Sequence, residues 1–250
     1  MPSIDLNADL GEQVAGTGHD EALLEVVTSA SIACGFHAGD PVVMHQTLAE
    51  AKRRGVTIGA HPSYADREGF GRIEQAISAR RLSDDILYQV GALEGLARAC
   101  GARVRFVKPH GALYNQMAID EECARAISEA VLAFGDLVLV VPAGSPAITV
   151  AERLGVVVAT EVFADRSYLP DGRLVPRGLP GALVTDPLEA ARRAVSLARD
   201  HVVPTVDGDS LELVGASICV HGDTPGALEL ARTVRGALRE AGITVSPFVS

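Results

Sequence analysis

The chain has 250 residues, of which 48% are hydrophobic, so it can form a large core and its composition argues against disorder. Its 22 lysine and arginine residues and 32 aspartate and glutamate residues give a formal net charge of −10, which argues against nucleic acid as the main partner. The four cysteines form no CxxC pair, and no apolar run approaches the roughly 20 residues that span a bilayer. We therefore expect a cytoplasmic protein with reduced thiols, no signal peptide and no membrane partner.

Short apolar runs with strand character alternate along the chain with longer segments of helical character. The expected strands cover residues 4–6, 31–34, 57–60, 103–107, 137–141, 156–161 and 216–220. The expected helices cover residues 20–29, 41–54, 83–99, 120–134, 145–153, 186–199 and 224–241. Three of these helices begin with a capping residue and a first-turn proline, at Asp40-Pro41, Asp186-Pro187 and Thr224-Pro225. Glycines that suit a left-handed residue follow four helices, at Gly55, Gly101, Gly155 and Gly242.

The alternation of strands and helices predicts right-handed βαβ units and a parallel sheet. About seven such units predict one α/β domain over residues 1–250, folded as an irregular, about seven-stranded parallel β/α barrel. An open doubly wound sheet is the alternative. It is less favoured, because polar residues follow most of the expected strands, whereas a single switch-point crevice would use only a few.

The first expected strand leads into a polar segment that contains Asp5, Asn7, Asp9 and Glu12. On a strand, Asp5, Asn7 and Asp9 would share one face, because successive side chains alternate. In a barrel that face points inward, where carboxylates are costly unless they are paired, metal-bound or solvated at the rim. A strand-end turn with capping carboxylates could account for Asp9 or Glu12 but not easily for Asp5, so we expect a functional site here.

Histidines follow the next two expected strands, at His37 and His61. The glycines beside His37 permit a tight turn into the next helix, whose expected cap is Asp40. The loop after His61, residues 62–72, is polar, aromatic and glycine-rich. Arg67 or Arg72 in this loop could hold a substrate carboxylate or phosphate, and either could equally form a structural ion pair.

Lys108 and His110 directly follow the fourth expected strand. A lysine that ends an apolar strand is partly desolvated, so it either pairs with acids or serves an anion or an acyl oxygen. Tyr114 and Asn115 come next and could hydrogen-bond a substrate or cap the following loop.

The last two expected strands also end in polar residues. Glu161 and Arg166 flank the end of the sixth run, and His221 and Asp223 follow the seventh. Residues 163–181, which lie between the sixth and seventh runs, include three prolines and three glycines. This composition predicts a long ordered loop that could act as a lid.

The histidines at four strand ends, together with Asp5 or Asp9, could hold a divalent metal such as zinc, or a harder ion if carboxylates dominate. Asp5, His37 and His61 are the candidate ligands. A metal-free acid/base site is equally viable, because no close spacing such as HxxxH marks a metal site. The chain contains neither a GxxxxGK[ST] loop nor a GxGxxG turn after a strand, so it carries no recognisable nucleotide-binding signature.

Six ordered segments together resemble the LamB/YcsF family, the family of bacterial 5-oxoprolinase A subunits. They are residues 5–12, 31–41, 59–72, 107–115, 161–177 and 218–223, and they span essentially the whole chain. Ser31 is the one small departure, where asparagine is expected. The resemblance implies a barrel akin to glycoside hydrolases and polysaccharide deacetylases. It also implies ATP-dependent opening of 5-oxoproline to L-glutamate with release of ADP and phosphate, ATP bound with magnesium, and B and C subunits as partners.

On this hypothesis, five residues are catalytic: Asp9, His61, Lys108, His110 and His221. Asp9 or His61 would be the base for the attacking water, and His110 or His221 would protonate the departing nitrogen. Lys108 and Arg166 would hold the phosphorylated oxygen or the substrate carboxylate. The expected substrate-binding residues are Asn7, Glu12, His37, Arg67, Tyr114, Asn115, Glu161 and Arg166.

Two other functions are compatible with the sequence. One is a stand-alone, metal-dependent amidase or deacetylase-like hydrolase. The other is a non-catalytic subunit whose strand-end residues only bind a ligand. The sequence also leaves open whether ATP binds to this chain or to the partner subunits.

Overall fold

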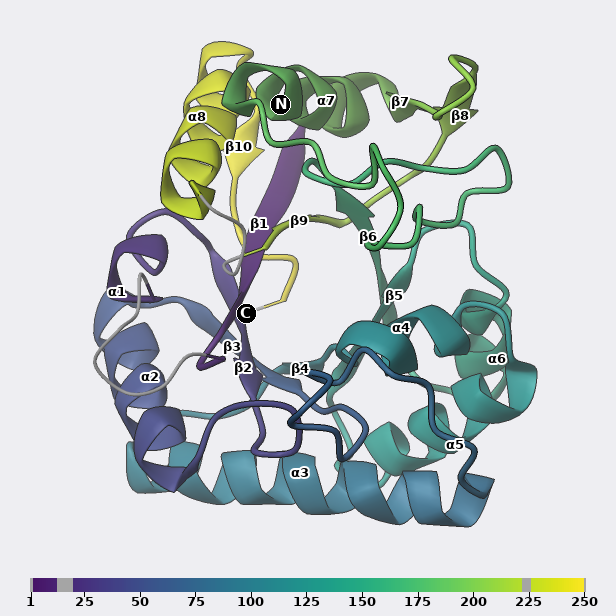
Figure 1. Cartoon of the computed structure of the whole chain (residues 1–250). Helices are drawn as coiled ribbons and strands as arrows, with labels where there is room; N and C mark the ends of the chain where they lie inside the picture. Colours follow the sequence, from purple (N-terminus) through teal and green to yellow (C-terminus); the bar gives the residue numbers. More distant parts are fainter. Residues whose placement is uncertain (1, 13–19, 222–225, 250) are drawn as a thin grey trace.

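The computed structural model describes residues 2–12, 20–221 and 226–249. Its centre is a closed parallel barrel, drawn in Figure 1, in which β1 (Ser3–Leu10) pairs on one side with β2 (Ser29–Ala33) and on the other with β9 (Ser217–Val220). Between β2 and β9 the order is β3 (Thr57–His61), β4 (Phe106–Val107), β5 (Val138–Pro142) and β6 (Val158–Phe163). These seven strands confirm the predicted irregular β/α barrel.

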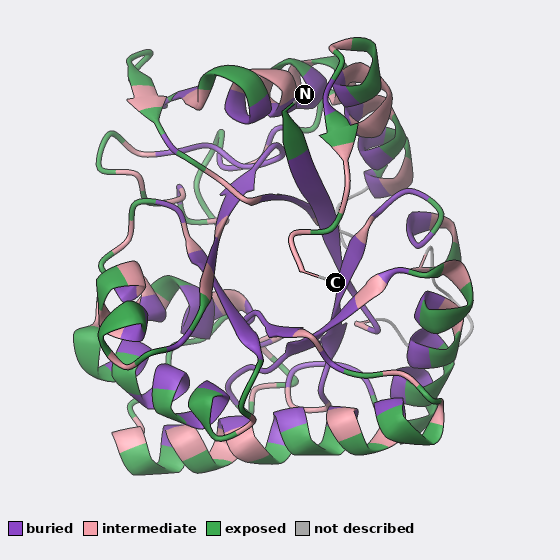
Figure 2. Ribbon diagram, turned by 180° about the vertical axis from the view of Figure 1, so that it is seen from behind, coloured by how far each residue is buried: buried purple, intermediate pink, exposed green. Residues whose placement is uncertain are grey.

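Helices surround the barrel and turn their buried faces towards it (Figure 2). They are α1 (Asp20–Leu23), α2 (Pro41–Arg54), α3 (Ala79–Ala99), α4 (Gly111–Met117), α5 (Glu121–Leu132), α6 (Ala147–Arg153), α7 (Pro187–Asp200) and α8 (Ala227–Glu240). None of the described helices is long and apolar enough to cross a membrane. Apolar side chains of the strands and of these helix faces together form the main core.

The expected helix caps are largely confirmed. Asp40 accepts hydrogen bonds from the backbone N–H groups of Val42 and Val43, and Asp186 accepts one from Leu188. Gly55, Gly101, Gly155 and Gly242 all have positive φ, as a left-handed residue after a helix requires. Thr224 lies outside the described residues.

Several element boundaries differ from the prediction. The helix expected over residues 20–29 ends at Leu23, because the chain joins the barrel at Ser29, whose hydroxyl donates to Asp5. The strand expected over 103–107 is reduced to Phe106 and Val107, which alone pair with β3 and β5. The short helix α4 and the hairpin of β7 (Val202–Pro204) and β8 (Ser210–Glu212) were not predicted, because such short elements have too little periodicity.

The C-terminal segment closes the end of the barrel at which the strands begin. The last short strand, β10 (Thr244–Val245), pairs with the start of β1, and Phe248 packs its ring 5.1 Å from that of Phe106. Gly59 allows this packing, because a Cβ at that position would lie 2.1 Å from the Phe106 ring. The described part of the barrel is therefore filled at this end, and polar side chains gather at the other.

Candidate active site

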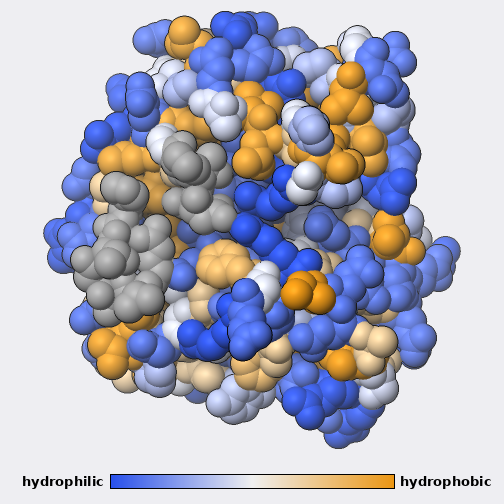
Figure 3. All heavy atoms as spheres, in the orientation of Figure 1, coloured by the Kyte–Doolittle hydropathy of each residue, from blue (hydrophilic) through white to orange (hydrophobic). Residues whose placement is uncertain are grey.

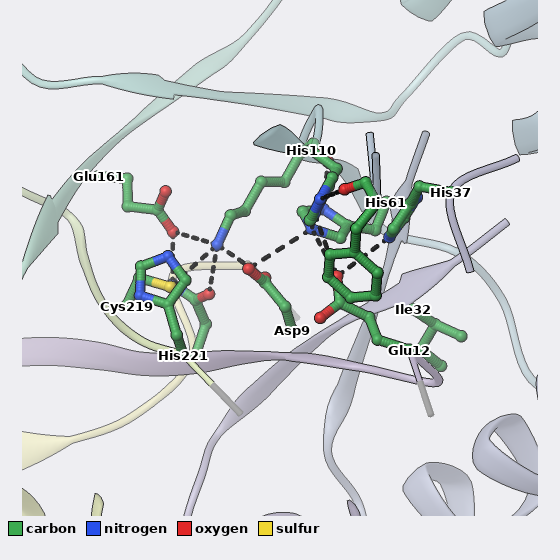
Figure 4. A network of polar contacts seen from close by, with 12 residues as sticks. Asp9, Glu12, Ile32, His37, His61, His110, Glu161, Cys219 and His221 are labelled. Atoms are coloured by element: carbon green, nitrogen blue, oxygen red, sulfur yellow. Dashed lines mark hydrogen bonds and ion pairs between the residues drawn. The ribbon is translucent and has the colours of Figure 1, made fainter. Parts of the chain in front are cut away.

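Polar side chains from most of the barrel strands converge where the strands end. Asn7 and Asp9 extend from β1, His61 from β3, Glu161 from β6 and Cys219 from β9. Further members lie just beyond strand ends, at Glu12, His37, Lys108, His110, Asp165 and His221. In Figure 4 the labelled members lie in two groups that meet at Asp9. This convergence is the arrangement expected for the active site of a β/α barrel.

Lys108 is the centre of the first group. Its Nζ lies 2.8 Å from Oδ1 of Asp9, 2.9 Å from Oε1 of Glu161, 3.1 Å from Oδ1 of Asn7 and 3.0 Å from Sγ of Cys219. Burial lowers the pKa of the Lys108 ammonium, but Asp9, Cys219 and Glu161 outweigh burial and hold it well above its usual value. The lysine therefore remains a cation, although its side chain is only 3% exposed.

Asp9 is the carboxylate partner of this lysine. Burial raises the pKa of Asp9, but the lowering by His61 and Lys108 outweighs burial, so this pKa lies well below its usual value. Asn7 donates hydrogen bonds of 2.8 Å to Glu161 and 2.7 Å to Ser217, which fixes the amide beside the lysine. The result is a buried ion pair of Lys108 and Asp9, beside which the Asn7 amide is held in place.

The second group consists of Glu12 and three histidines. Oε1 of Glu12 lies 3.0 Å from Nε2 of His37, 3.1 Å from Nδ1 of His110 and 3.7 Å from Nε2 of His61. The rings of His37 and His110 are stacked, with centroids 3.8 Å apart. All four ligand atoms lie within 4.8 Å of one another, so the described residues contain a cluster that could hold a metal ion.

Two backbone carbonyls fix how His61 and His110 carry their protons. Nδ1 of His61 lies 2.7 Å from the carbonyl oxygen of Lys108, and Nε2 of His110 lies 2.9 Å from that of Phe70. A carbonyl only accepts, so each of these nitrogens bears a hydrogen. In the neutral rings, the lone pairs are then on Nε2 of His61 and Nδ1 of His110, which are only 2.9 Å apart.

His221 forms a separate pair with Asp165. Its Nδ1 lies 2.8 Å from Oδ2 of Asp165, and its backbone N–H donates to the same oxygen at 3.0 Å. Burial raises the pKa of Asp165, but His221 outweighs burial and holds it below the usual value. The carboxylate thus orients the imidazole, as in acid–base dyads, and Nε2 remains for proton transfer.

A cavity of about 1110 Å³ opens above these groups and includes Asp9, His61, Lys108, His110, Glu161 and His221 in its lining. Tyr114 and Asn115 also line it, as the predicted substrate-binding roles require. Figure 3 shows this side of the molecule, where hydrophilic residues predominate around the centre.

The long segment after β6 forms another wall of the cavity, with residues 168–169 and 171–178 in the lining. The segment is ordered by its own contacts, as predicted. Arg166 donates to the carbonyls of Val175 at 2.6 Å and Ala182 at 3.3 Å, and the Tyr168 hydroxyl accepts from the Phe163 N–H at 2.8 Å. Its action as a lid remains a prediction.

Arginines gather in this wall and next to it, although acidic residues such as Glu161 and Asp171 line the same cavity. Arg72, Arg166, Arg173 and Arg177 all line the cavity. Burial lowers the pKa of Arg166 to about 10, and its neighbours Arg177 and Arg72 act in the same direction. Guanidinium groups that gather in this way suit a carboxylate or phosphate ligand.

Five predicted site residues do not line the cavity: Asp5, Asn7, Glu12, His37 and Arg67. Asn7, Glu12 and His37 still belong to the two groups described above, whereas Asp5 and Arg67 do not. Asp5 accepts hydrogen bonds from Thr28, Ser29 and Ser217 deeper in the barrel, so it does not join His37 and His61 as a metal ligand. Glu12 and His110 take its place in the cluster. Arg67 donates to the backbone carbonyls of Gly35 and Gly39, so it ties two loops together instead of facing the cavity.

Other site residues had a different role in the prediction or none. Cys219 was predicted only to be a buried thiol, although it precedes His221 in the same strand-end pattern that marked the other members. The Phe70 carbonyl, which fixes His110, had no sequence signal, because backbone contacts between loops depend on the fold. Phe70 has a φ of 55°, a strained value for a residue other than glycine.

The sequence matches the LamB/YcsF family over residues 4–250. A relative from Kocuria rhizophila, whose name describes it as the A subunit of 5-oxoprolinase, is 51% identical, and the match covers 99% of this chain and 100% of the relative. The crystal structure of a lactam utilization protein from Thermus thermophilus is 44% identical, with a TM-score of 0.92 and coverage of 98% of this chain and 99% of that one. A family 4 carbohydrate esterase from Streptomyces lividans is 10% identical, with a TM-score of 0.51 and coverage of 98% and 91%, a likeness that shows the fold alone.

Proposed function

Because this chain belongs to the LamB/YcsF family, we propose that it acts as the A subunit of a 5-oxoprolinase. The reaction hydrolyses the lactam ring of 5-oxoproline to L-glutamate and converts ATP to ADP and phosphate. The Kocuria rhizophila relative supports this proposal through its name and its full-length match. The observation that carries the proposal is the buried Lys108 cation, held beside Asp9 and Glu161 in a cavity whose wall is rich in arginine.

The need for ATP follows from the chemistry of the lactam. The ring carbonyl is a resonance-stabilised amide and therefore a poor electrophile. Transfer of the γ-phosphoryl group to the amide oxygen gives an activated imidate and releases ADP. Water adds to the activated carbon, the C–N bond breaks, and the ring nitrogen leaves as the amine. The resulting acyl phosphate is hydrolysed by a second water to glutamate and phosphate.

The cavity can hold the anionic groups that form in these reaction steps. Lys108 provides a fixed positive charge for the oxygen that carries the phosphoryl group, because its pKa keeps it protonated. Arg72, Arg166 and Arg177 line the same cavity and suit the substrate carboxylate or the phosphate. Tyr114 and Asn115 are in reach of the substrate as hydrogen-bonding groups.

We assign the proton transfers to His221. Asp165 orients this imidazole through Nδ1, so Nε2 can take a proton from the attacking water and give one to the departing nitrogen. Asp9 is a weak base, since its pKa lies well below the usual value, and its role is to fix Lys108. His61 and His110 line the cavity, but each has one ring nitrogen committed to a backbone carbonyl. The other nitrogen faces Asp9 and Glu12 in His61 and faces Glu12 in His110.

The active form on this proposal is a cytoplasmic complex with the B and C subunits. The sequence contains no P-loop, which favours ATP binding on a partner chain. On this proposal the chain therefore depends on its partner subunits for turnover. The test is glutamate release from 5-oxoproline with ATP and magnesium, by this chain alone and with the B and C subunits added. We expect turnover only in the mixture. An inactive mixture of folded, associated subunits would contradict the proposal.

The histidine cluster favours a second candidate, a metal-dependent amidase that needs no ATP. For this function we expect turnover of acylated amines by the chain alone, loss of activity with a chelator and no effect of ATP omission. Binding of 5-oxoproline without turnover, even with both partners present, would instead indicate a non-catalytic, ligand-binding role.

A further inference from the structure

The cluster of Glu12, His37, His61 and His110 has the dimensions of a coordination site. A tetrahedral site with metal–ligand bonds of about 2.1 Å places neighbouring ligand atoms about 3.4 Å apart. The measured separations around Oε1 of Glu12 are 3.0, 3.1 and 3.7 Å, and the two facing nitrogens of His61 and His110 are 2.9 Å apart. Three of these separations are shorter and one is longer than the distance of about 3.4 Å expected between neighbouring ligand atoms. A small outward adjustment of the side chains would therefore accommodate one ion.

The hydrogen bonds of the second ring nitrogens of His61 and His110 also indicate a metal site. Metal-binding histidines usually donate their second N–H to a carbonyl or carboxylate, which aims the other nitrogen at the ion. His61 does this with the Lys108 carbonyl at 2.7 Å, and His110 does it with the Phe70 carbonyl at 2.9 Å. Both lone pairs are thereby aimed at one point, together with a carboxylate oxygen. With both rings neutral and no cation between them, these groups repel one another.

The surroundings also suit a bound ion. All four ligand side chains are at most 6% exposed, and the Phe70 ring covers His37 and His110 edge-on with centroids 5.6 and 5.4 Å away. His61 and His110 reach the cavity lining, whereas Glu12 and His37 lie behind them. An ion held here would face the cavity and could bind a water or a substrate oxygen on that side.

A second group that could hold a metal, Asp9, Cys219 and His221, is less suited. The ammonium of Lys108 lies 2.8 Å from Asp9 and 3.0 Å from the Cys219 sulfur. A positive charge therefore already neutralises this group, and a second cation next to it would be repelled.

We propose that Glu12, His37, His61 and His110 bind one divalent metal ion of the zinc class, with three nitrogen ligands and one oxygen ligand, at the edge of the cavity. The ligand set favours zinc or a neighbouring first-row ion over magnesium or calcium, which prefer oxygen ligands. The proposal concerns the isolated chain and does not rest on 5-oxoprolinase activity, so either can fail without the other.

The test measures metal binding by the full-length chain after treatment with a chelator and dialysis. Zinc and cobalt(II) are added separately, bound metal is counted by elemental analysis, and the cobalt spectrum reports the ligands. We expect one ion per chain and cobalt d–d bands without a thiolate charge-transfer band. Glu12→Gln and His37→Gln should each weaken binding by at least about 10-fold. Glu12→Gln keeps the side-chain shape and is the safer variant for folding.

His45→Gln is the matched control, because His45 lies on α2 away from the cluster and its loss should leave metal binding unchanged. Circular dichroism verifies that each variant is folded. The proposal is overturned if folded wild-type chain takes up no zinc or cobalt at micromolar concentrations. That outcome would assign the cluster to a proton shared between the histidines. A thiolate band, or unaltered binding by folded Glu12→Gln, would also overturn it and place the ion elsewhere.

Discussion

Asp5 is a carboxylate buried deep in the barrel, where it is 1% exposed and accepts hydrogen bonds from three hydroxyl groups. Burial raises its pKa from 3.8 to about 6. Between these two values the folded protein holds a proton that the unfolded chain has released. The contribution of Asp5 to the free energy of unfolding therefore falls as pH rises from about 4 to about 6, and it stays low at higher pH.

Asp5→Asn should remove this pH dependence, because the amide does not titrate. Relative to wild type, we expect the variant to gain roughly 2 kcal/mol in unfolding free energy between pH 4 and pH 7. Urea unfolding of both proteins at several pH values measures this difference. A difference that stays constant with pH would contradict the raised pKa.

Asp5 also shows which part of the site could be predicted from single residues. Asp5, Asn7 and Asp9 do share the inner face of β1, as the alternation of side chains predicted. Asp5 lies four residues before Asp9, which is about 13 Å at 3.3 Å per residue. The period of a strand indicates which face a side chain occupies, but its depth in the barrel depends on where the strand pairs. That register comes only from the folded sheet.

At the scale of elements, the loop between β3 and α3 packs its backbone directly against the histidine cluster. A Cβ added to Gly71, whose φ is 65°, would lie 2.8 Å from the His110 ring and 2.9 Å from Cβ of His37. The neighbouring Phe70 carbonyl accepts the hydrogen bond that fixes His110. Glycine is therefore required at position 71 both for the backbone conformation and for the close approach.

Gly71→Ala should destabilise the protein by about 1–3 kcal/mol and displace His110, because a left-handed backbone and a close contact are both affected. Gly91→Ala is the control: Gly91 lies within α3, where a Cβ meets nothing within 4 Å. In this helix alanine should stabilise by about 0.5–1 kcal/mol. Thermal unfolding of the two variants should thus shift in opposite directions. Equal shifts would show that the packing of this loop is not specific.

Long helices were mostly predicted well, and short elements were not; the longest strand, β1, was predicted only over residues 4–6, and α3 begins at residue 79 instead of 83. The helices after Asp40 and Asp186 begin where their caps and prolines placed them, since these signals are local. By contrast, β4 and α4 meet between Val107 and Gly111, within a few residues that carry both Lys108 and His110. Such a short turn has no periodicity of its own. Its conformation is set by pairing with β3 and β5 and by the hydrogen bond from the His110 N–H to the Pro62 carbonyl.

At the scale of the whole molecule, the two ends of the barrel have different chemistry. Phe106, Val138, Val140 and Ala159 form an apolar cluster with the C-terminal segment at one end. Charged groups collect at the other end, and the net charge of −10 contrasts with the arginines and the lysine around the cavity. Cations gathered in a cavity of an acidic protein can attract small anionic ligands, although carboxylates such as Glu161 and Asp171 line the same cavity.

The central claim is that this end of the barrel is the active site for the 5-oxoprolinase reaction. The most direct measurement is the rate of ATP-dependent glutamate release by the complex with the B and C subunits, assembled with wild-type chain, with Lys108→Met or with Lys52→Met. Lys52 is the only other lysine in the chain and lies on α2, outside the cavity lining, so it is the matched control. Circular dichroism and co-purification verify folding and assembly.

We expect Lys108→Met to lower the rate by at least about 100-fold, because it removes the fixed charge that stabilises the phosphorylated oxygen. The Lys52→Met complex should keep the wild-type rate. If the folded and assembled Lys108→Met complex also keeps the wild-type rate, Lys108 does not serve the reaction and the active site lies elsewhere.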